Sequence, residues 1–217
     1  MKSFTSTIFT VCLMLSAAST QSPTLLNFQG EVYLRQGLNN NWQPCEIGMR
    51  LAESDVLRTE KNSTGEIEIT PGQAFHLPEQ VILEGRELKA YATSELVKVL
   101  TVLEISNLPT QPRQLNRSSG AYVVHDNQKS VHIRELQTKQ YIEMELNGLQ
   151  ALINQNFWSG ALLKAIKLKK YKKLVDLEFL DFQVLLSYQK LGLNRRFEDA
   201  RDKFMENYPG SQYREKL

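Results

Sequence analysis

Residues 42–69, WQPCEIGMRLAESDVLRTEKNSTGEIEI, consist of short apolar runs separated by turns that contain glycine or polar side chains. Toward the end of this segment, Ile67 and Ile69 alternate with Glu66 and Glu68. A period of two residues is typical of a strand that buries one face and exposes the other. We therefore predict that this segment forms several short β-strands rather than helices.

The segments on either side of residues 42–69 continue the same pattern. Further strands are predicted at residues 29–35, 74–77 and 80–83. A Thr-Pro-Gly sequence at 70–72 is a strong turn signal between two of the strands. Five or six short strands at close spacing predict a small antiparallel sandwich or barrel-like unit over residues 28–85.

After residue 85 the apolar residues recur at the spacing of a helix rather than a strand. The expected parts are a connecting helix at 86–106, a proline-containing linker at 107–120, a short hairpin at 121–134 and a helical region at 135–217. Four helices with short connections in the last part suggest two antiparallel helix pairs. The predicted fold class is therefore α+β, with the strands first and the helices last.

The first twenty residues have the pattern of a secretory signal peptide. Lys2 is followed by an apolar core at 8–15 and by small residues at 16–20. The core is too short to span a bilayer, and cleavage is expected between Ala18 and Gln21. No later segment is long and apolar enough for a transmembrane helix. We therefore predict a soluble protein that is periplasmic or secreted.

The composition is that of an ordinary globular protein. The chain has 217 residues, of which 41% are hydrophobic and 23% charged, and its formal net charge is +2. This near-neutral balance gives no reason to expect a nucleic acid partner. After removal of the signal peptide one cysteine remains, Cys45, which we interpret as a small buried residue because no histidine lies near it in sequence.

The β region resembles the FecR-type domain of exported bacterial proteins. The resemblance covers roughly residues 28–83 and rests on Gly30-Glu31-Val32, Trp42, Gly48-Met49-Arg50-Leu51, Asp55-Val56-Leu57-Arg58-Thr59 and Glu66-Ile67-Glu68-Ile69. The chain departs from that family at two places. Ser54 stands where the family usually has glycine, and residues 71–73 stand where an Asp-Gly pair is common in the family. The resemblance implies a β-rich scaffold or binding module without enzymatic activity.

The last helices look like a tetratricopeptide unit. The positions that carry this second resemblance are Leu185, Tyr188, Leu191-Gly192, Phe197, Ala200, Phe204, Tyr208-Pro209, Ser211 and Tyr213. The last of these positions, Phe204, Tyr208-Pro209, Ser211 and Tyr213, are similar to the end of repeats in bacterial envelope proteins of the BamD and Tol-Pal-associated type. The resemblance implies a helical surface that binds another protein. In physical terms, a small Ala200 permits close helix approach, Phe204 fills the gap and Pro209 ends the second helix.

A dense run of lysines is the most conspicuous charged feature. It comprises Lys164, Lys167, Lys169, Lys170, Lys172 and Lys173 around Tyr171, with no acidic residue between them. Such a run could bind an anionic envelope glycan, a lipid headgroup or an acidic protein. The alternative is a solvated helix end that is stabilised by the helix dipole. Our candidate partner-binding residues are Lys169, Lys170, Tyr171, Lys172, Lys173 and Tyr188.

The sequence contains no recognisable catalytic, cofactor or metal motif, and we expect none of these functions. His76, His125 and His132 are the only histidines, and no cysteine or close carboxylate pair accompanies them. Glu53 and Asp55 with Arg58 are interpreted as a turn that forms its own hydrogen bonds.

The sequence as a whole favours a non-enzymatic exported envelope protein that scaffolds or binds a protein partner. The alternative is a module that binds peptidoglycan or another polysaccharide. For that function Tyr33, Trp42 and Trp158 would offer stacking faces, although Trp42 is better interpreted as part of the β core.

Overall fold

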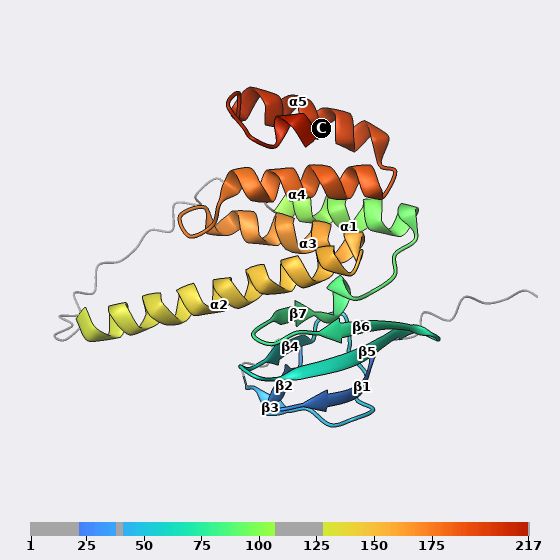
Figure 1. Ribbon diagram of the computed structural model, residues 1–217, viewed down its shortest axis with the longest axis vertical. Helices are drawn as coiled ribbons and strands as arrows, with labels where there is room; N and C mark the ends of the chain where they lie inside the picture. Colours follow the sequence, from blue (N-terminus) through green and yellow to red (C-terminus); the bar gives the residue numbers. More distant parts are fainter. Residues whose placement is uncertain (1–21, 38–40, 107–127, 217) are drawn as a thin grey trace, which may run out of the picture.

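The computed structural model of the chain describes residues 22–37, 41–106 and 128–216. Two small antiparallel sheets form the N-terminal part, and helices stacked on one side of them form the rest (Figure 1). The α+β class is therefore as predicted. The predicted signal peptide and the linker at 107–120 lie outside the described residues.

The strands form two separate sheets. The first has the order β1-β5-β6, with bounds Thr24–Gln29, Thr64–Thr70 and Gln73–Leu77. The second has the order β3-β2-β4-β7, with bounds Gln43–Pro44, Val32–Arg35, Val56–Thr59 and Ile82–Glu84. Within the described residues the strands do not close into a barrel, so of the two predicted arrangements the sandwich is the one formed.

The inner faces of both sheets contribute to one hydrophobic core. Ile67 and Ile69 are buried in it, whereas Glu66 and Glu68 remain partly exposed, as their alternation predicted. Leu34 and Leu57 meet this layer from the second sheet. Cys45 is buried, as expected, and burial raises the pKa of its thiol to about 11.

The predicted first strand at 29–35 is wrong in its beginning. The chain turns at Gly30, whose positive φ of 77° separates β1 from β2, and residue 29 belongs to the preceding strand. Ser63 lies so close to Gly30 that a side chain there would collide with it. β1 was not predicted, although its Leu25 is fully buried, because a single core leucine shows no alternation.

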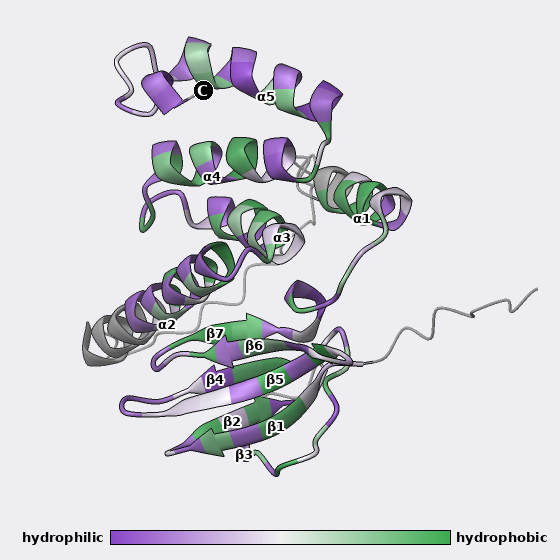
Figure 2. Ribbon diagram, turned by 45° about the vertical axis from the view of Figure 1, so that its right-hand side comes forward, coloured by the Kyte–Doolittle hydropathy of each residue, from purple (hydrophilic) through white to green (hydrophobic). Residues whose placement is uncertain are grey.

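Within the described residues, five α-helices follow the strands. Their bounds are Thr93–Ser106 for α1, Gln128–Asn154 for α2, Trp158–Leu168 for α3, Leu177–Lys190 for α4 and Asn194–Asn207 for α5. The helices α2, α3, α4 and α5 stack in chain order away from the sheets, and α1 lies beside α3 and α4 (Figures 1 and 2). The outermost helix, α5, is largely hydrophilic (Figure 2).

Two predicted boundaries in this part need correction. Residues 130–133, expected as the second strand of a hairpin, belong to helix α2, and the expected first strand lies outside the described residues. Their β-branched residues lie within a long helix, where helix continuity overrides strand propensity. The connecting helix begins at Thr93 rather than residue 86, because Gly85–Glu87 forms a separate 3₁₀ turn, η1.

Two glycines bring the helices into close contact with the sheet. A side chain on Gly148 of α2 would overlap the carbonyl oxygen of Ile82, and one on Gly160 of α3 would overlap that of Glu87. The core cluster is continuous from the strands into the helices. Phe75 of β6, for example, packs edge-on against Phe157 with ring centroids 5.1 Å apart. The strands and helices therefore form one packed body.

Candidate functional site

The lysine run is divided by the fold into a buried part and an exposed part. Lys164 is 0% exposed. Its Nζ lies 2.5 Å from Glu145, 2.9 Å from Glu87 and 2.9 Å from the carbonyl oxygen of Ile82. Lys167 pairs with Glu84 and Glu145 at 2.6 Å each. These two lysines therefore belong to an internal ion network, and neither sequence interpretation of the run applies to them.

The ion network joins three parts of the fold. Glu84 and Glu87 come from β7 and η1, Glu145 from α2, and the two lysines from α3. Burial alone would raise the pKa of Glu145, but Lys164 and Lys167 outweigh it and lower that pKa to about 2. Glu84 behaves in the same way, and its pKa is lowered. At Glu87 burial prevails over the lysines, and the pKa is raised.

These pKa shifts predict a loss of stability in acid. Groups with lowered pKa stabilise the fold above their unfolded-state pKa of about 4.3, and this contribution disappears as the pH falls toward about 2. Glu87, whose pKa is raised, has the opposite sign, and its contribution rises as the pH falls toward about 4.3, which is above this window. We expect the free energy of unfolding, from urea titrations, to fall over this pH window. Glu145→Gln should be less stable at pH 7 but should show a flatter acid limb, and equal slopes would contradict the assignment.

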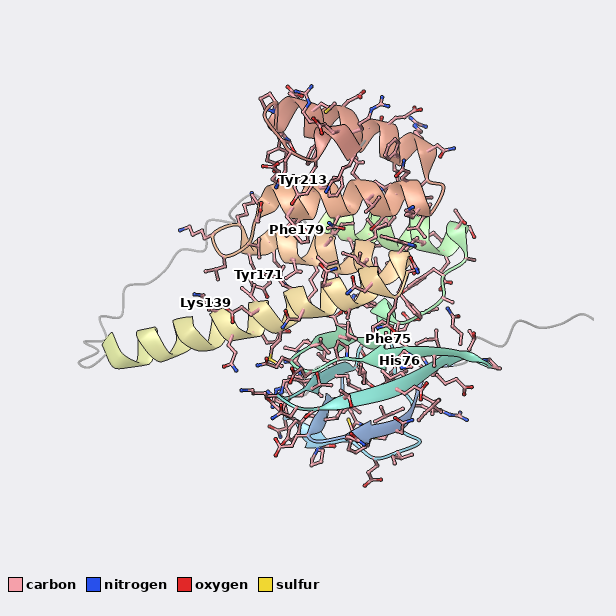
Figure 3. All side chains as sticks on the ribbon, viewed as in Figure 1. Phe75, His76, Lys139, Tyr171, Phe179 and Tyr213 are labelled. Carbon is pink, nitrogen blue, oxygen red and sulfur yellow. The ribbon has the colours of Figure 1, made fainter. Side chains whose placement is uncertain are left out.

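The remaining lysines lie around the end of α3. Lys169 forms an ion pair with Asp181 at 2.5 Å, and Lys170 lies over the ring of Tyr171 at 5.0 Å from its centroid. Lys170, Lys172 and Lys173 are exposed. Tyr171 packs against the core in the turn that follows α3 (Figure 3). Of the six predicted partner-binding residues, only Lys169 and Tyr188 line a groove together.

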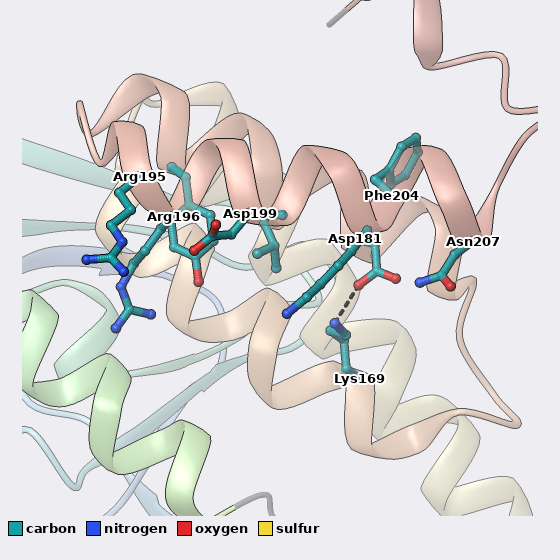
Figure 4. Close-up of a pocket in the computed structure, with 11 residues that line it drawn as sticks. Lys169, Asp181, Arg195, Arg196, Asp199, Phe204 and Asn207 are labelled. Carbon is teal, nitrogen blue, oxygen red and sulfur yellow. Dashed lines mark ion pairs between the residues drawn. The ribbon is translucent and has the colours of Figure 1, made fainter.

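The groove runs between α4 and α5 and has a volume of about 620 Å³. Its apolar residues are Val184, Tyr188, Ala200 and Phe204. Around them lie the polar residues Lys169, Asp181, Arg195, Arg196, Asp199, Lys203 and Asn207. Arg195 and Arg196 lie at one end of the groove, and Lys169, Asp181 and Asn207 at the other (Figure 4).

Helical periodicity explains why these residues share one groove. On α5, positions 195, 199, 203 and 207 recur every four residues and therefore lie on one face. On α4, Asp181, Val184 and Tyr188 do the same at spacings of three and four. The predicted site residues did not include Arg195, Arg196, Asp199 and Lys203, although the four-residue spacing of charges on α5 is a usable signal in the sequence.

The C-terminal segment packs against helices α4 and α5. After Pro209 the chain turns back, and Tyr213 stacks on Phe182 with ring centroids 4.3 Å apart (Figure 3). Tyr208 donates a hydrogen bond of 2.8 Å to Asp181. Burial, followed by this bond, raises the pKa of Tyr208 to about 12. Phe204 is buried beside Phe182, so its predicted role as a filler between the helices is confirmed.

The other candidate residues have structural partners. Asp55 is buried and accepts hydrogen bonds from the backbone N–H groups of Gly37 and Ala52, as expected for a turn. Trp42 packs against the core, and the guanidinium of Arg58 lies over its ring at 4.5 Å from the centroid. Trp42 is half-buried and packs on a small cluster of Val56, Ile82 and Met144, so it is not one of the fully buried core residues that the sequence interpretation expected. The glycan-binding alternative stays a prediction.

Of the three histidines, the structure describes the side chain of His76 alone. His76 is exposed on β6, and its backbone N–H and carbonyl both bond the side chain of Gln155. His125 lies outside the described residues, and the side chain of His132 is not described. Among the described side chains, no three potential metal ligands come together.

Comparisons of the chain with models of protein families, with curated proteins and with solved structures gave no match. The FecR-type and tetratricopeptide resemblances therefore stay predictions from the sequence. Within the described residues, no helix combines the length and the apolar composition that a bilayer span requires.

Proposed function

We propose that this protein is a non-enzymatic, exported adaptor of the cell envelope that binds a protein partner in the groove between α4 and α5. The observation that supports this function most directly is the composition of the groove. Its apolar residues Val184, Tyr188, Ala200 and Phe204 are surrounded by charged and polar side chains. An apolar centre with a polar rim is the usual arrangement of protein interfaces.

The position of the groove suits an adaptor. It lies at the end of the helix stack that is farthest from the two sheets (Figure 1). The ion network of Lys164 and the close contacts at Gly148 and Gly160 hold the helices against the sheets. A partner bound at α4 and α5 would therefore be held in a defined position relative to any partner of the β unit.

The function is tested by crosslinking in the cell that produces the protein. A photoreactive amino acid is placed at position 203, in the groove, and in a second strain at position 61, an exposed residue between β4 and β5. We expect a protein adduct in the envelope fraction from position 203 only, identified by mass spectrometry. No adduct from position 203, or the same adducts from both positions, would reject the groove as a binding site.

A further inference from the structure

The charges around the groove are unbalanced. Its lining includes four cationic side chains, Lys169, Arg195, Arg196 and Lys203, and two carboxylates, Asp181 and Asp199. Asp181 already receives Lys169 and the hydroxyl of Tyr208. The rest of the lining contains three cationic side chains, Arg195, Arg196 and Lys203, and one carboxylate, Asp199. Arg195 and Arg196 lie at the end of the groove away from Lys169 (Figure 4).

The rest of α5 shows that this surplus is local. The helix also carries Glu198, Asp202 and Glu206, which recur every four residues and do not line the groove. The acidic side chains of α5 are thus mostly on a neighbouring face, whereas Arg195 and Lys203 lie at the groove. The helix as a whole is not basic, so its general charge does not account for a cationic groove.

From these observations we infer that the groove binds an acidic peptide segment whose carboxylates meet Arg195, Arg196 and Lys203 while an apolar side chain lies against the half-buried Ala200. This inference rests on the proposed function and specifies the partner. Arginine guanidinium groups bind carboxylates through paired hydrogen bonds, which favours a carboxylate-bearing segment. The half-buried Ala200 favours a peptide over a simple anion, because a simple anion would leave this apolar part of the groove uncovered.

The length of the groove sets the size of the segment. Positions 195 to 207 of α5 span about 18 Å at 1.5 Å per helical residue. An extended peptide covers this distance with about five or six residues at about 3.3 Å each. A segment that alternates acidic and apolar residues would place its apolar side chains toward the apolar part of the groove and its carboxylates toward the rim.

The inference is tested by fluorescence anisotropy with the mature protein. The probe is a fluorescein-labelled peptide of about seven residues that alternates Asp or Glu with Leu or Phe, a length chosen from the groove span. A second peptide carries Asn and Gln in place of every acidic residue. We expect the acidic peptide to bind at least about tenfold more tightly and to weaken as salt is raised, because rim charges are screened.

Two charge-reversal variants make the test specific. The first variant, Arg195→Glu with Lys203→Glu, reverses two positive charges that line the groove. The second variant, Lys61→Glu with Lys139→Glu, reverses two exposed lysines that lie elsewhere, on the β4–β5 turn and on α2. Figure 3 shows Lys139 on α2, well separated from α5. The first variant should lose about tenfold or more in affinity, and the second less than about twofold. Thermal unfolding of both variants checks that the fold is intact.

A third variant tests the apolar part of the groove. Ala200→Phe adds a ring to a half-buried position in the groove, so it should displace the apolar side chain of the peptide and weaken binding, whereas Ala200→Ser should not. Equal loss of affinity in both charge-reversal variants, or equal binding of the acidic and amide peptides, would overturn the inference. Competition by inorganic phosphate or by vesicles of anionic phospholipid, without competition by unlabelled peptide, would overturn it as well.

The two proposals can fail separately. If the acidic peptide does not bind but position 203 still yields a specific protein adduct in the cell, the groove is a protein-binding site with a partner of other chemistry. If neither result is obtained, the proposed function and the inference both fail.

Discussion

Replacing Lys164 with methionine is expected to lower the free energy of unfolding by about 3–5 kcal/mol. The Lys164 ammonium group is completely buried and contacts Glu87, Glu145 and the carbonyl oxygen of Ile82. Its removal leaves the Glu87 carboxylate inside the protein without a cation in direct contact. An unpaired buried charge costs far more than the ion pair itself contributes, and urea unfolding at pH 7 measures the difference.

Two further variants identify the cause of this loss. Lys169→Met removes a partly exposed lysine whose pair with Asp181 is solvated, and it should cost no more than about 1 kcal/mol. Lys164→Met combined with Glu87→Gln should recover part of the loss, because no charge is then left unpaired at residue 87. A Lys164→Met protein as stable as the Lys169→Met protein would show that the network carries no such penalty.

Replacing Gly160 with alanine should destabilise the protein by about 3 kcal/mol, the upper part of the range for overpacked cores. In an exposed helix the same change is stabilising by up to about 1 kcal/mol, because alanine is the better helix former. Here the added methyl group would overlap the carbonyl oxygen of Glu87 and contact Leu152. Relief of that overlap requires α3 to move away from η1, which also lengthens the contacts of Lys164.

The control for Gly160 is Gly210, which has no heavy atom within 4 Å of an added side chain. Gly210→Ala should change the free energy of unfolding by less than about 0.5 kcal/mol. Gly148→Ala, which overlaps the carbonyl oxygen of Ile82 from α2, should act in the same direction as Gly160→Ala. Thermal and urea unfolding monitored by circular dichroism provide the comparison. An increase in stability for Gly160→Ala would show that α3 can move away from η1 at little cost.

Elements that one local pattern covers over their whole length are predictable from the sequence. The alternation at Ile67 and Ile69 correctly predicted β5, and the helical spacing over 135–217 correctly predicted a helical region, to which α4 belongs. Asp176 caps α4 and accepts a hydrogen bond of 3.1 Å from the N–H of Phe179, as an acidic residue at a helix start commonly does. Such elements are specified by the preferences of neighbouring residues, which are all visible in the sequence.

The same approach failed where short runs were ambiguous. Residues 130–133 have β-branched side chains and were predicted as a strand, yet they belong to α2, whose later residues Ile142 and Leu149 are anchored in the core. Propensity differences of less than about 1 kcal/mol per residue are small beside the burial of such side chains. The outcome therefore depended on packing that no window of a few residues reveals.

The local order of strands, turns and helices follows from the sequence, because alternation, helical spacing and turn residues act between near neighbours. The tertiary structure determined what the charged residues do. Lys164, Lys169 and Lys170 are alike in sequence, but folding buries the first against two carboxylates and places the second at a groove. The third stays exposed. Their partners come from other helices and strands, so only the long-range packing of the chain distinguishes a structural lysine from one that can meet a partner.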